Sequence, residues 1–134
     1  MFDALDIPAS ALVAQRARME TIAANISSSD VSGNEAAGNP PYRRRFVVLA
    51  AGTAQDPSQP GVHVQSIGLD QSPFRKVYDP GHKDADADGY VEYPNVEPTI
   101  EMVNMIEASR AYEANVTMMD SMKSMITSSL RLLA

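Results

Sequence analysis

The sequence predicts an α+β fold, with long N- and C-terminal helices paired as an α-helical coiled-coil-like domain and a small β-rich domain inserted between them. Two sets of apolar residues spaced by seven, one near each end of the chain, indicate the helices, because side chains seven apart return to one side of a helix. Alternating apolar and polar residues in the middle indicate strands. The predicted helical domain combines residues 1–30 with 97–134, and the β-rich domain, residues 31–96, starts with a flexible loop.

The C-terminal helix is expected from about Glu97 to Ala134, because the chain has neither Gly nor Pro after Pro98. At about 1.5 Å per residue it would be roughly 55 Å long, which exceeds the three or four turns of an ordinary globular helix. Its apolar residues form two neighbouring rows, which we expect to pack between subunits. The predicted packing positions are Met102, Met105, Tyr112, Val116, Met119, Met122, Ile126, Leu130 and Leu133.

The N-terminal helix is expected to begin between Asp6 and Ala9, with Pro8 in its first turn, where the missing N–H costs nothing. Gly33 is a natural end for this helix or its frayed last turn. A companion row of small residues would let a partner helix approach closely. The packing positions expected in this helix are Leu5, Leu12, Met19, Ile22 and Ile26.

Burial inside a single chain is the ordinary explanation for an apolar helical row. Two features favour additional neighbours here. The C-terminal helix is longer than its partner, and it is apolar over more than one narrow stripe at Met118, Met119, Met122, Met125 and Ile126. A helix that is apolar beyond one stripe needs more than one neighbour.

The middle of the chain contains three strand-like segments and a shorter extended piece. Residues in Val62–Leu69 alternate between apolar and polar, the pattern of a half-buried strand. The other segments are Tyr42–Leu49, Phe74–Tyr78 and Tyr90–Val96.

Composition excludes several classes of function. The net charge of -6 argues against a nucleic-acid-binding protein that relies on phosphate contacts. The absence of Cys excludes disulfides, thiolate catalysis and thiolate metal sites. No apolar run approaches the roughly 20 residues of a transmembrane helix. Asp3 and Asp6 stand where a signal peptide would be positive, so the protein is expected to be cytoplasmic or exported without a cleaved leader.

No constellation of residues indicates an enzyme, a cofactor or a metal site. The sequence lacks a Gly-x-Ser-x-Gly elbow and a Gly-rich phosphate loop, and we find no nucleophile–base pair for a hydrolase. His63 and His82 are expected on different elements. Neither forms a pair with a Glu at the spacing that places two metal ligands on one side of a helix. We therefore expect no catalytic residues, no cofactor and no bound metal.

The acidic loop 84–95 is the one motif that suggests a different function. Its three alternating aspartates and following Gly match the opening of an EF-hand loop, but Asn95 occupies the twelfth position, where calcium needs a bidentate Glu. A solvated acidic turn is the preferred interpretation. The alternative is a free helical protein with a calcium-dependent switch at this loop. The aspartates concerned are Asp84, Asp86 and Asp88.

The basic run 43–45 has two interpretations that the sequence leaves equal. Its charges could protect a strand edge from wrong pairing, or they could contact an acidic neighbour. Polar residues that could make contacts between subunits are Arg16, Asn25, Arg43, Arg44, Arg45, Arg110 and Asn115.

Several strings resemble a known family. The segment Ala11–Ile26 is similar to the N-terminal signature of bacterial flagellar rod and hook proteins, and four later segments resemble proximal rod members of that family. The resemblance covers nearly the whole chain. It departs at Ser28 and Val31, where the family usually has Asn and Thr, so the end of the first helix is expected to differ in detail. The later segments are Pro41–Arg44, Ser72–His82, Gly89–Val96 and Glu101–Val116.

The resemblance implies a structural subunit of the flagellar proximal rod and not an enzyme. It implies that the terminal helices form an inner domain, that many copies pack helically around the export channel, and that the rod transmits motor torque to the distal rod and hook. The implied partners are further copies, other rod proteins, basal-body proteins on the export-gate and MS-ring side, and the type III export apparatus. The implied location is the periplasmic rod of the basal body, reached without a cleaved signal peptide.

Overall fold

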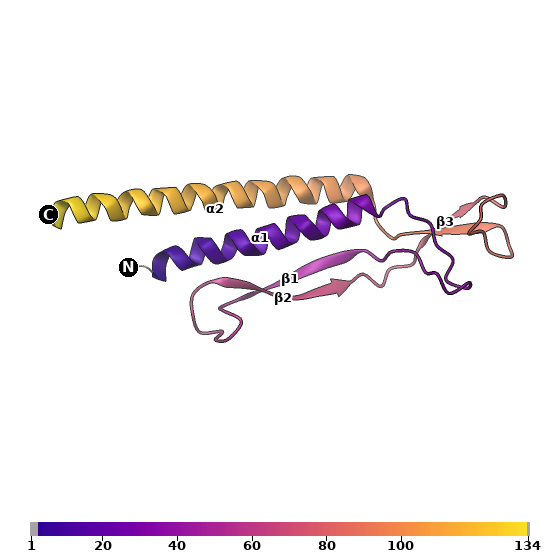
Figure 1. Ribbon diagram of the computed structural model, residues 1–134, viewed down its shortest axis with the longest axis horizontal. Helices are drawn as coiled ribbons and strands as arrows, with labels where there is room; N and C mark the ends of the chain where they lie inside the picture. The colour runs from indigo at the N-terminus through magenta and orange to yellow at the C-terminus, as the bar shows by residue number, and fades with distance from the viewer. Residues whose placement is uncertain (1–2, 134) are drawn as a thin grey trace. The chain divides into compact units, whose positions relative to one another are not determined.

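The computed structural model describes residues 3–133, which form two terminal helices with antiparallel β-sheets between them (Figure 1). The predicted α+β fold is confirmed. The elements in chain order are α1 (Asp3–Ser27), β1 (Arg45–Ala51), β2 (Val62–Leu69), β3 (Arg75–Tyr78), β4 (Tyr90–Tyr93) and α2 (Pro98–Leu133).

Helix α2 has 36 residues and begins with Pro98, which needs no N–H partner in the first helical position. Glu101 lies in its first turn and Arg131 in its last, so both charges oppose the helix dipole favourably. The expected bounds of this helix are confirmed to within one residue. Among the described residues, neither helix combines the length and apolarity that crossing a membrane requires.

Helix α1 begins at Asp3, earlier than the start expected between Asp6 and Ala9. Pro8 therefore lies inside the helix and not in its first turn. The residue removes one N–H from the hydrogen-bond ladder, a loss that a helix tolerates best near its end. At the other end α1 stops at Ser27, where the N–H of Ser28 still bonds the carbonyl of Ala24 at 3.1 Å. The helix thus ends six residues before Gly33.

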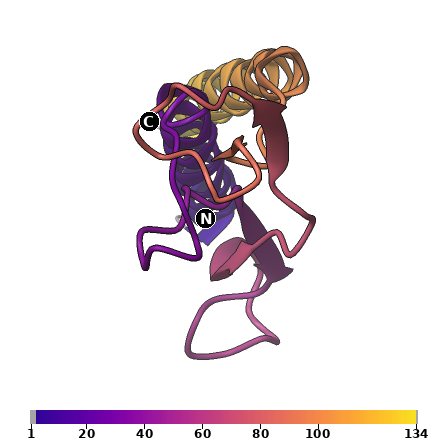
Figure 2. The same cartoon turned by 90° about the vertical axis from the view of Figure 1, so that its right-hand side faces the viewer.

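The four strands form two separate two-stranded sheets, β1–β2 and β3–β4 (Figure 2). In the second sheet Arg75 pairs with Tyr93 and Tyr78 pairs with Tyr90. Gly89, just before β4, has φ of +84°, which an L side chain adopts only with strain. The three predicted strands are present in the expected order, with β1 beginning three residues later than expected, and the extended piece predicted at Tyr90–Val96 contains a fourth strand, β4.

The segment expected as a flexible loop is hydrogen-bonded to β4. The N–H of Gly33 donates to the carbonyl of Glu92 at 2.9 Å, and Asn34 forms a bridge with Asn39. A Cβ at Gly33 would lie 2.5 Å from the Pro41 nitrogen. Only glycine therefore fits at this close approach.

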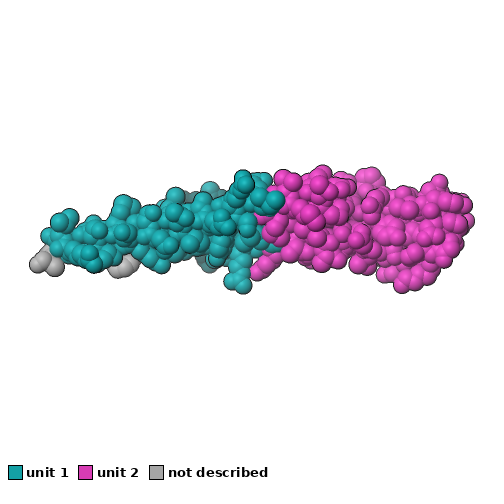
Figure 3. Space-filling model, turned by 90° about the horizontal axis from the view of Figure 1, so that it is seen from above, with its two compact units in different colours: residues 1–19, 47–66, 106–134 teal, residues 20–46, 67–105 magenta. Residues whose placement is uncertain are grey.

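The chain divides into two compact units, coloured separately in Figure 3. The first comprises residues 1–19, 47–66 and 106–134. In it α1 and α2 run side by side in opposite directions, and Arg18 pairs with Glu107 at 3.3 Å (Figure 1). The hydroxyl of Ser10 in α1 accepts the N–H of Val62 at 3.1 Å, which attaches the β1–β2 hairpin to α1.

The second unit comprises residues 20–46 and 67–105. Its core is small and mixes apolar with polar side chains. Ile22, Val91 and Val96 are buried, and so are Asn25 and Glu101. This buried polar pair lies where α1 ends and α2 begins.

Candidate assembly surface

Each helix has an apolar face that is partly covered within the chain. In α1, Ile22 is buried and the other predicted packing positions are half-buried. Ala14 in α1 and Ala108 in α2 are also buried, as expected for small side chains where helices approach closely. The half-buried packing positions are Leu5, Leu12, Met19 and Ile26 in α1, and Met105, Tyr112, Met119, Met122 and Ile126 in α2.

The remaining predicted packing positions of α2 are exposed to solvent. Met102, Val116 and Leu130 belong to this group. Leu133 lies in α2, but its side chain falls outside the described residues. The two neighbouring apolar rows of α2 therefore differ in exposure. The row that contains Met105 and Tyr112 is half-buried within the chain, and the row that contains Met102 and Val116 is exposed.

A further exposed row, which we call the outer row, consists of Met118, Met125 and Leu132. These side chains are 51%, 61% and 88% exposed, and they are spaced by seven. At about 1.5 Å per residue the row extends for roughly 20 Å along α2. Continuous apolar surface of this kind on a soluble chain indicates a site of contact with another protein.

The polar candidates on the helices lie in different surroundings. Arg16 and Arg110 are exposed. Asn115 is half-buried, and its amide donates to the carbonyl of Ala111 at 2.8 Å, within its own helix. Arg110 is therefore placed for contacts outside the chain, whereas Asn115 uses a donor within its own helix.

Asn25 is fully buried, and its side chain makes four hydrogen bonds within the chain. Its amide donates to the carbonyl of Arg45 at 2.8 Å and to Oε2 of Glu101 at 2.9 Å. Its carbonyl accepts the N–H of Arg45 at 2.9 Å and the hydroxyl of Tyr42 at 3.0 Å. These bonds use the donors and acceptors of an Asn side chain completely.

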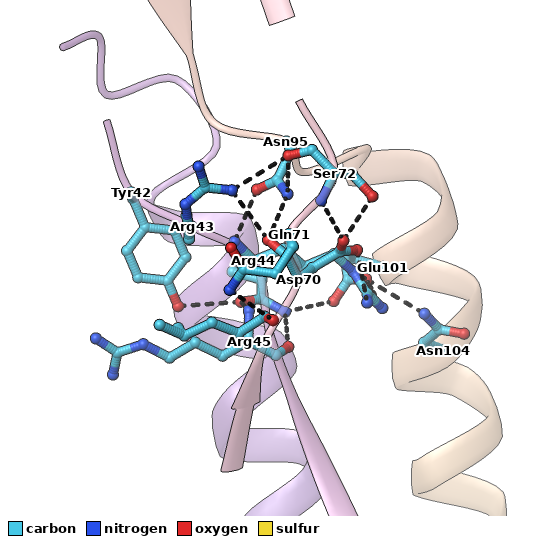
Figure 4. Close-up of polar contacts among 12 residues, drawn as sticks. Tyr42, Arg43, Arg44, Arg45, Asp70, Gln71, Ser72, Asn95, Glu101 and Asn104 are labelled. Carbon is cyan, nitrogen blue, oxygen red and sulfur yellow. Dashed lines mark hydrogen bonds and ion pairs between the residues drawn. The ribbon is translucent and has the colours of Figure 1, made fainter. Parts of the chain in front are cut away.

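Glu101 is 1% exposed and is compensated by Arg44. Nε and Nη2 of Arg44 each lie 2.8 Å from Oε1 of Glu101, as Figure 4 shows, and Asn104 lies 3.3 Å from the same oxygen. A buried carboxylate is stable only when it is paired and hydrogen-bonded in this way. We call Asn25, Arg44 and Glu101 the junction cluster.

Residues around the junction cluster extend this polar network (Figure 4). The N–H of Arg44 donates to Oδ1 of Asn95 at 2.9 Å, and its Nη1 lies 3.7 Å from Oδ2 of Asp70. The hydroxyl and N–H of Ser72 both donate to Asp70 and hold the pKa of its carboxyl below the ordinary value, with smaller contributions from Arg44 and Arg43.

The three arginines of the basic run have different environments. Nη1 of Arg43 donates to the carbonyls of Asp70 and Ser72, and its guanidinium lies 4.3 Å from the centre of the Phe74 ring. Arg44 belongs to the junction cluster. Arg45 is exposed, with its guanidinium 5.3 Å from the Tyr42 ring centre. Two of the three charges are therefore engaged inside the chain.

Residues 84–89 of the acidic loop lie in the connection between β3 and β4, and β4 itself occupies residues 90–93 of the loop. Oδ1 of Asp86 accepts the N–H groups of Asp88 and Tyr90, each at 2.9 Å, and Oδ2 of Asp84 accepts the hydroxyl of Ser32 at 2.8 Å. Within residues 3–133, no group of three or more His, Cys, Asp or Glu side chains is arranged to hold a metal ion. The aspartates shape a turn and attach it to the segment after α1.

The two histidines lie in different units. Nδ1 of His63 is 3.0 Å from the carbonyl of Gly52, and Nδ1 of His82 accepts the N–H of Asp84 at 3.1 Å. Each ring therefore makes a local contact in a turn or strand.

The first comparison with known proteins concerns the C-terminal part of the chain and indicates a class of protein. A family model described as "Flagellar basal body rod FlgEFG protein C-terminal" matches residues 87–132, which contain β4 and nearly all of α2. The part of the chain that carries the outer row is therefore similar to the C-terminal part of flagellar rod proteins.

Whole-length relatives define the family more closely. The chain is 40% identical to the flagellar basal-body rod protein FlgC of Salmonella typhimurium, over 98% of this chain and 97% of that protein. It is 38% identical to the FlgC of Bacillus subtilis and 40% identical to that of Borreliella burgdorferi, in each case over at least 97% of both chains. The chain belongs to the FlgC family of flagellar basal-body rod proteins. The resemblance found in the sequence is thus confirmed, and these relatives are structural proteins, not enzymes.

Sequence reasoning missed most of the polar network. Asn25 and Arg44 were singled out as polar contact residues. Glu101 and Asp70 were not, and Asn95 was considered only as a position of the calcium-like loop. A signal for Glu101 was present, because it lies seven residues before Ala108 and four before Met105, on the covered face of α2. A carboxylate at such a position needs a partner inside the fold.

Proposed function

We propose that this protein is a structural subunit of the proximal rod, which polymerises helically around the export channel and transmits motor torque to the distal rod and hook. The observation that carries this proposal is the outer row of α2. Its apolar side chains repeat every seven residues, as in a seam that packs against another helix, yet the chain leaves them exposed. The relatives of the chain are named as rod proteins.

Burial of the outer row would favour assembly substantially. Each Met or Leu side chain removed from water contributes about 1.5–3 kcal/mol, so the three residues contribute roughly 5–9 kcal/mol before the entropic cost of association. Met102, Val116 and Leu130 add to this surface. Helices that interlock along a long interface resist relative motion, which suits a part that must transmit torque.

The inner domain of the assembled rod would be formed by the terminal helices, residues 1–30 and 97–134, and the outer domain by residues 31–96. Exposed Arg16, Arg45 and Arg110 would make polar contacts with neighbouring subunits. Those neighbours would be copies of this chain, other rod proteins and basal-body proteins on the export-gate and MS-ring side. The subunit would reach the periplasm unfolded through the type III export apparatus.

Charge placed in the outer row tests the proposal. Met118→Asp and Met125→Asp should leave the single chain folded, because both side chains are exposed, but should prevent assembly by burying a carboxylate. Ser124→Asp adds the same charge at an exposed position outside the row and serves as the matched control. The assays are circular dichroism of the purified chain, swimming of a complemented deletion strain, and electron microscopy of its basal bodies. Normal swimming with complete rods in both methionine variants would refute the proposal.

A calcium titration separates this proposal from the calcium switch at loop 84–95. Because Oδ1 of Asp86 already accepts two backbone N–H groups, we expect no heat of binding at millimolar calcium. Heat together with a change in helix content would instead support the switch.

A further inference from the structure

The apolar rows leave the alignment of the two helices ambiguous. The rows repeat every seven residues in both helices, so a slide of one helix by seven residues would again place apolar side chains opposite apolar ones. Such a slide loses one pair at an end of the seam and keeps the others. The repeated positions are Leu5, Leu12, Met19 and Ile26 in α1, and Met105, Tyr112, Met119 and Ile126 in α2.

We infer that the junction cluster selects one register of α1 against α2. Two contacts, each within its own unit, report the observed antiparallel register: Asn25 with Glu101, and Arg18 with Glu107. A slide of seven residues in one direction would bring Ala108 to the place of Glu101 opposite Asn25. The methyl group of alanine accepts no hydrogen bond, so the buried amide of Asn25 would lose a partner.

A slide in the other direction is also disfavoured. It would bring Pro94, which lies outside the helix and cannot continue one, to the position opposite Asn25. Glu101 would approach Arg18, but it would lose both 2.8 Å contacts with Arg44 and the one with Asn25. Both alternatives therefore break the cluster, whereas the apolar rows tolerate either one.

The start of β1 provides the common reference for the two helices. The backbone of Arg45 binds the side chain of Asn25 at the end of α1 through both its N–H and its carbonyl. The side chain of the preceding residue, Arg44, binds Glu101 at the beginning of α2. Two consecutive residues thus fix both helices. A buried polar group that selects one register at some cost in stability is a known use of such residues in helix pairs.

The inference concerns the isolated chain and is independent of the rod proposal. Its test measures one distance between spin labels on the two helices. The chain has no Cys, so Val13→Cys in α1 and Ser128→Cys in α2, both exposed and in the same unit, take the labels without competing thiols. A slide by seven residues changes their separation by about 10 Å, in a direction that shows which way the helix moved.

The cluster is removed with Asn25→Leu/Glu101→Leu, which replaces buried polar groups by apolar ones and leaves no buried charge unpaired. In the parent chain we expect one distance, and in this variant a second distance displaced by about 10 Å. Asn115→Leu is the matched control, because it makes the same Asn-to-Leu change at a half-buried position of α2 where the side chain bonds only its own helix. It should keep the single parental distance.

Three results would overturn the inference. The first is a single, unshifted distance in the double variant, which would mean that the connections to the β-strands set the register. The second is the same displaced distance in Asn115→Leu. The third is loss of helical circular dichroism in the double variant, which would make the cluster a requirement for helix formation and not a selector of register.

Discussion

Replacement of Arg44 by methionine should destabilise the chain by leaving a buried carboxylate unpaired. Glu101 is 1% exposed and receives two 2.8 Å contacts from this arginine. Removal of one partner of a buried ion pair costs about 3–5 kcal/mol, and because the Arg44 side chain is itself partly exposed we expect the lower end, about 3 kcal/mol. In a chain of this length, that loss corresponds to a decrease in Tm of roughly 10 °C.

The measurement is urea and thermal unfolding of the purified chain, followed by circular dichroism. Arg44→Met/Glu101→Met should recover most of the lost stability, because it replaces the pair by apolar side chains and leaves no buried charge. The comparison of both single variants with the double variant isolates the pair energy. An Arg44→Met chain that unfolds at the parental urea concentration would show that Glu101 does not depend on this partner, and the reasoning would be wrong.

Three further predictions concern stability. Hydrogen bonds from Ser72 lower the pKa of Asp70 below its ordinary value of 3.8, so this carboxylate stabilises the fold above that pH and the contribution is lost as pH falls through the folded-state pKa. Asp70→Asn should therefore flatten the acid side of a stability–pH profile; an unchanged profile would contradict the assignment. Gly33→Ala places a methyl group 2.5 Å from the Pro41 nitrogen and should lower the free energy of unfolding, measured with urea, by about 1–3 kcal/mol. An unchanged free energy of unfolding would mean that the segment around Gly33 shifts freely to accommodate the methyl group. Ser10→Ala removes the acceptor for the first N–H of β2 and should cost about 1 kcal/mol, and no change in the urea midpoint would show that water replaces the hydroxyl.

The elements with uninterrupted patterns were predicted well from the sequence. The alternation in Val62–Leu69 gave the bounds of β2, and the absence of Gly and Pro after Pro98 gave those of α2. The start of α1 was predicted too late because Pro8 was interpreted as a start signal. Proline is compatible with a position inside a helix when only one hydrogen bond near the end is lost, and the sequence does not distinguish the two cases.

The candidate site was predicted only in part. The sequence shows Met102 and Met105 as members of two equivalent neighbouring rows, and tertiary packing decides that the first is exposed and the second half-buried. The partners of Asn25 come from segments distant in sequence, so spacing alone could not connect it with Glu101. The polar contacts expected between subunits thus stay predictions, and Asn25 is already fully hydrogen-bonded inside the chain.

The composition of the outer row makes the unassembled subunit chemically vulnerable. Two of its members, Met118 and Met125, carry thioethers that are more than half exposed. Oxidants convert a thioether to a sulfoxide, which is polar and therefore unsuited to a dry helix contact. A subunit damaged in this way before incorporation would be rejected by its neighbours, whereas the same sulfurs would be shielded once they were covered in the rod.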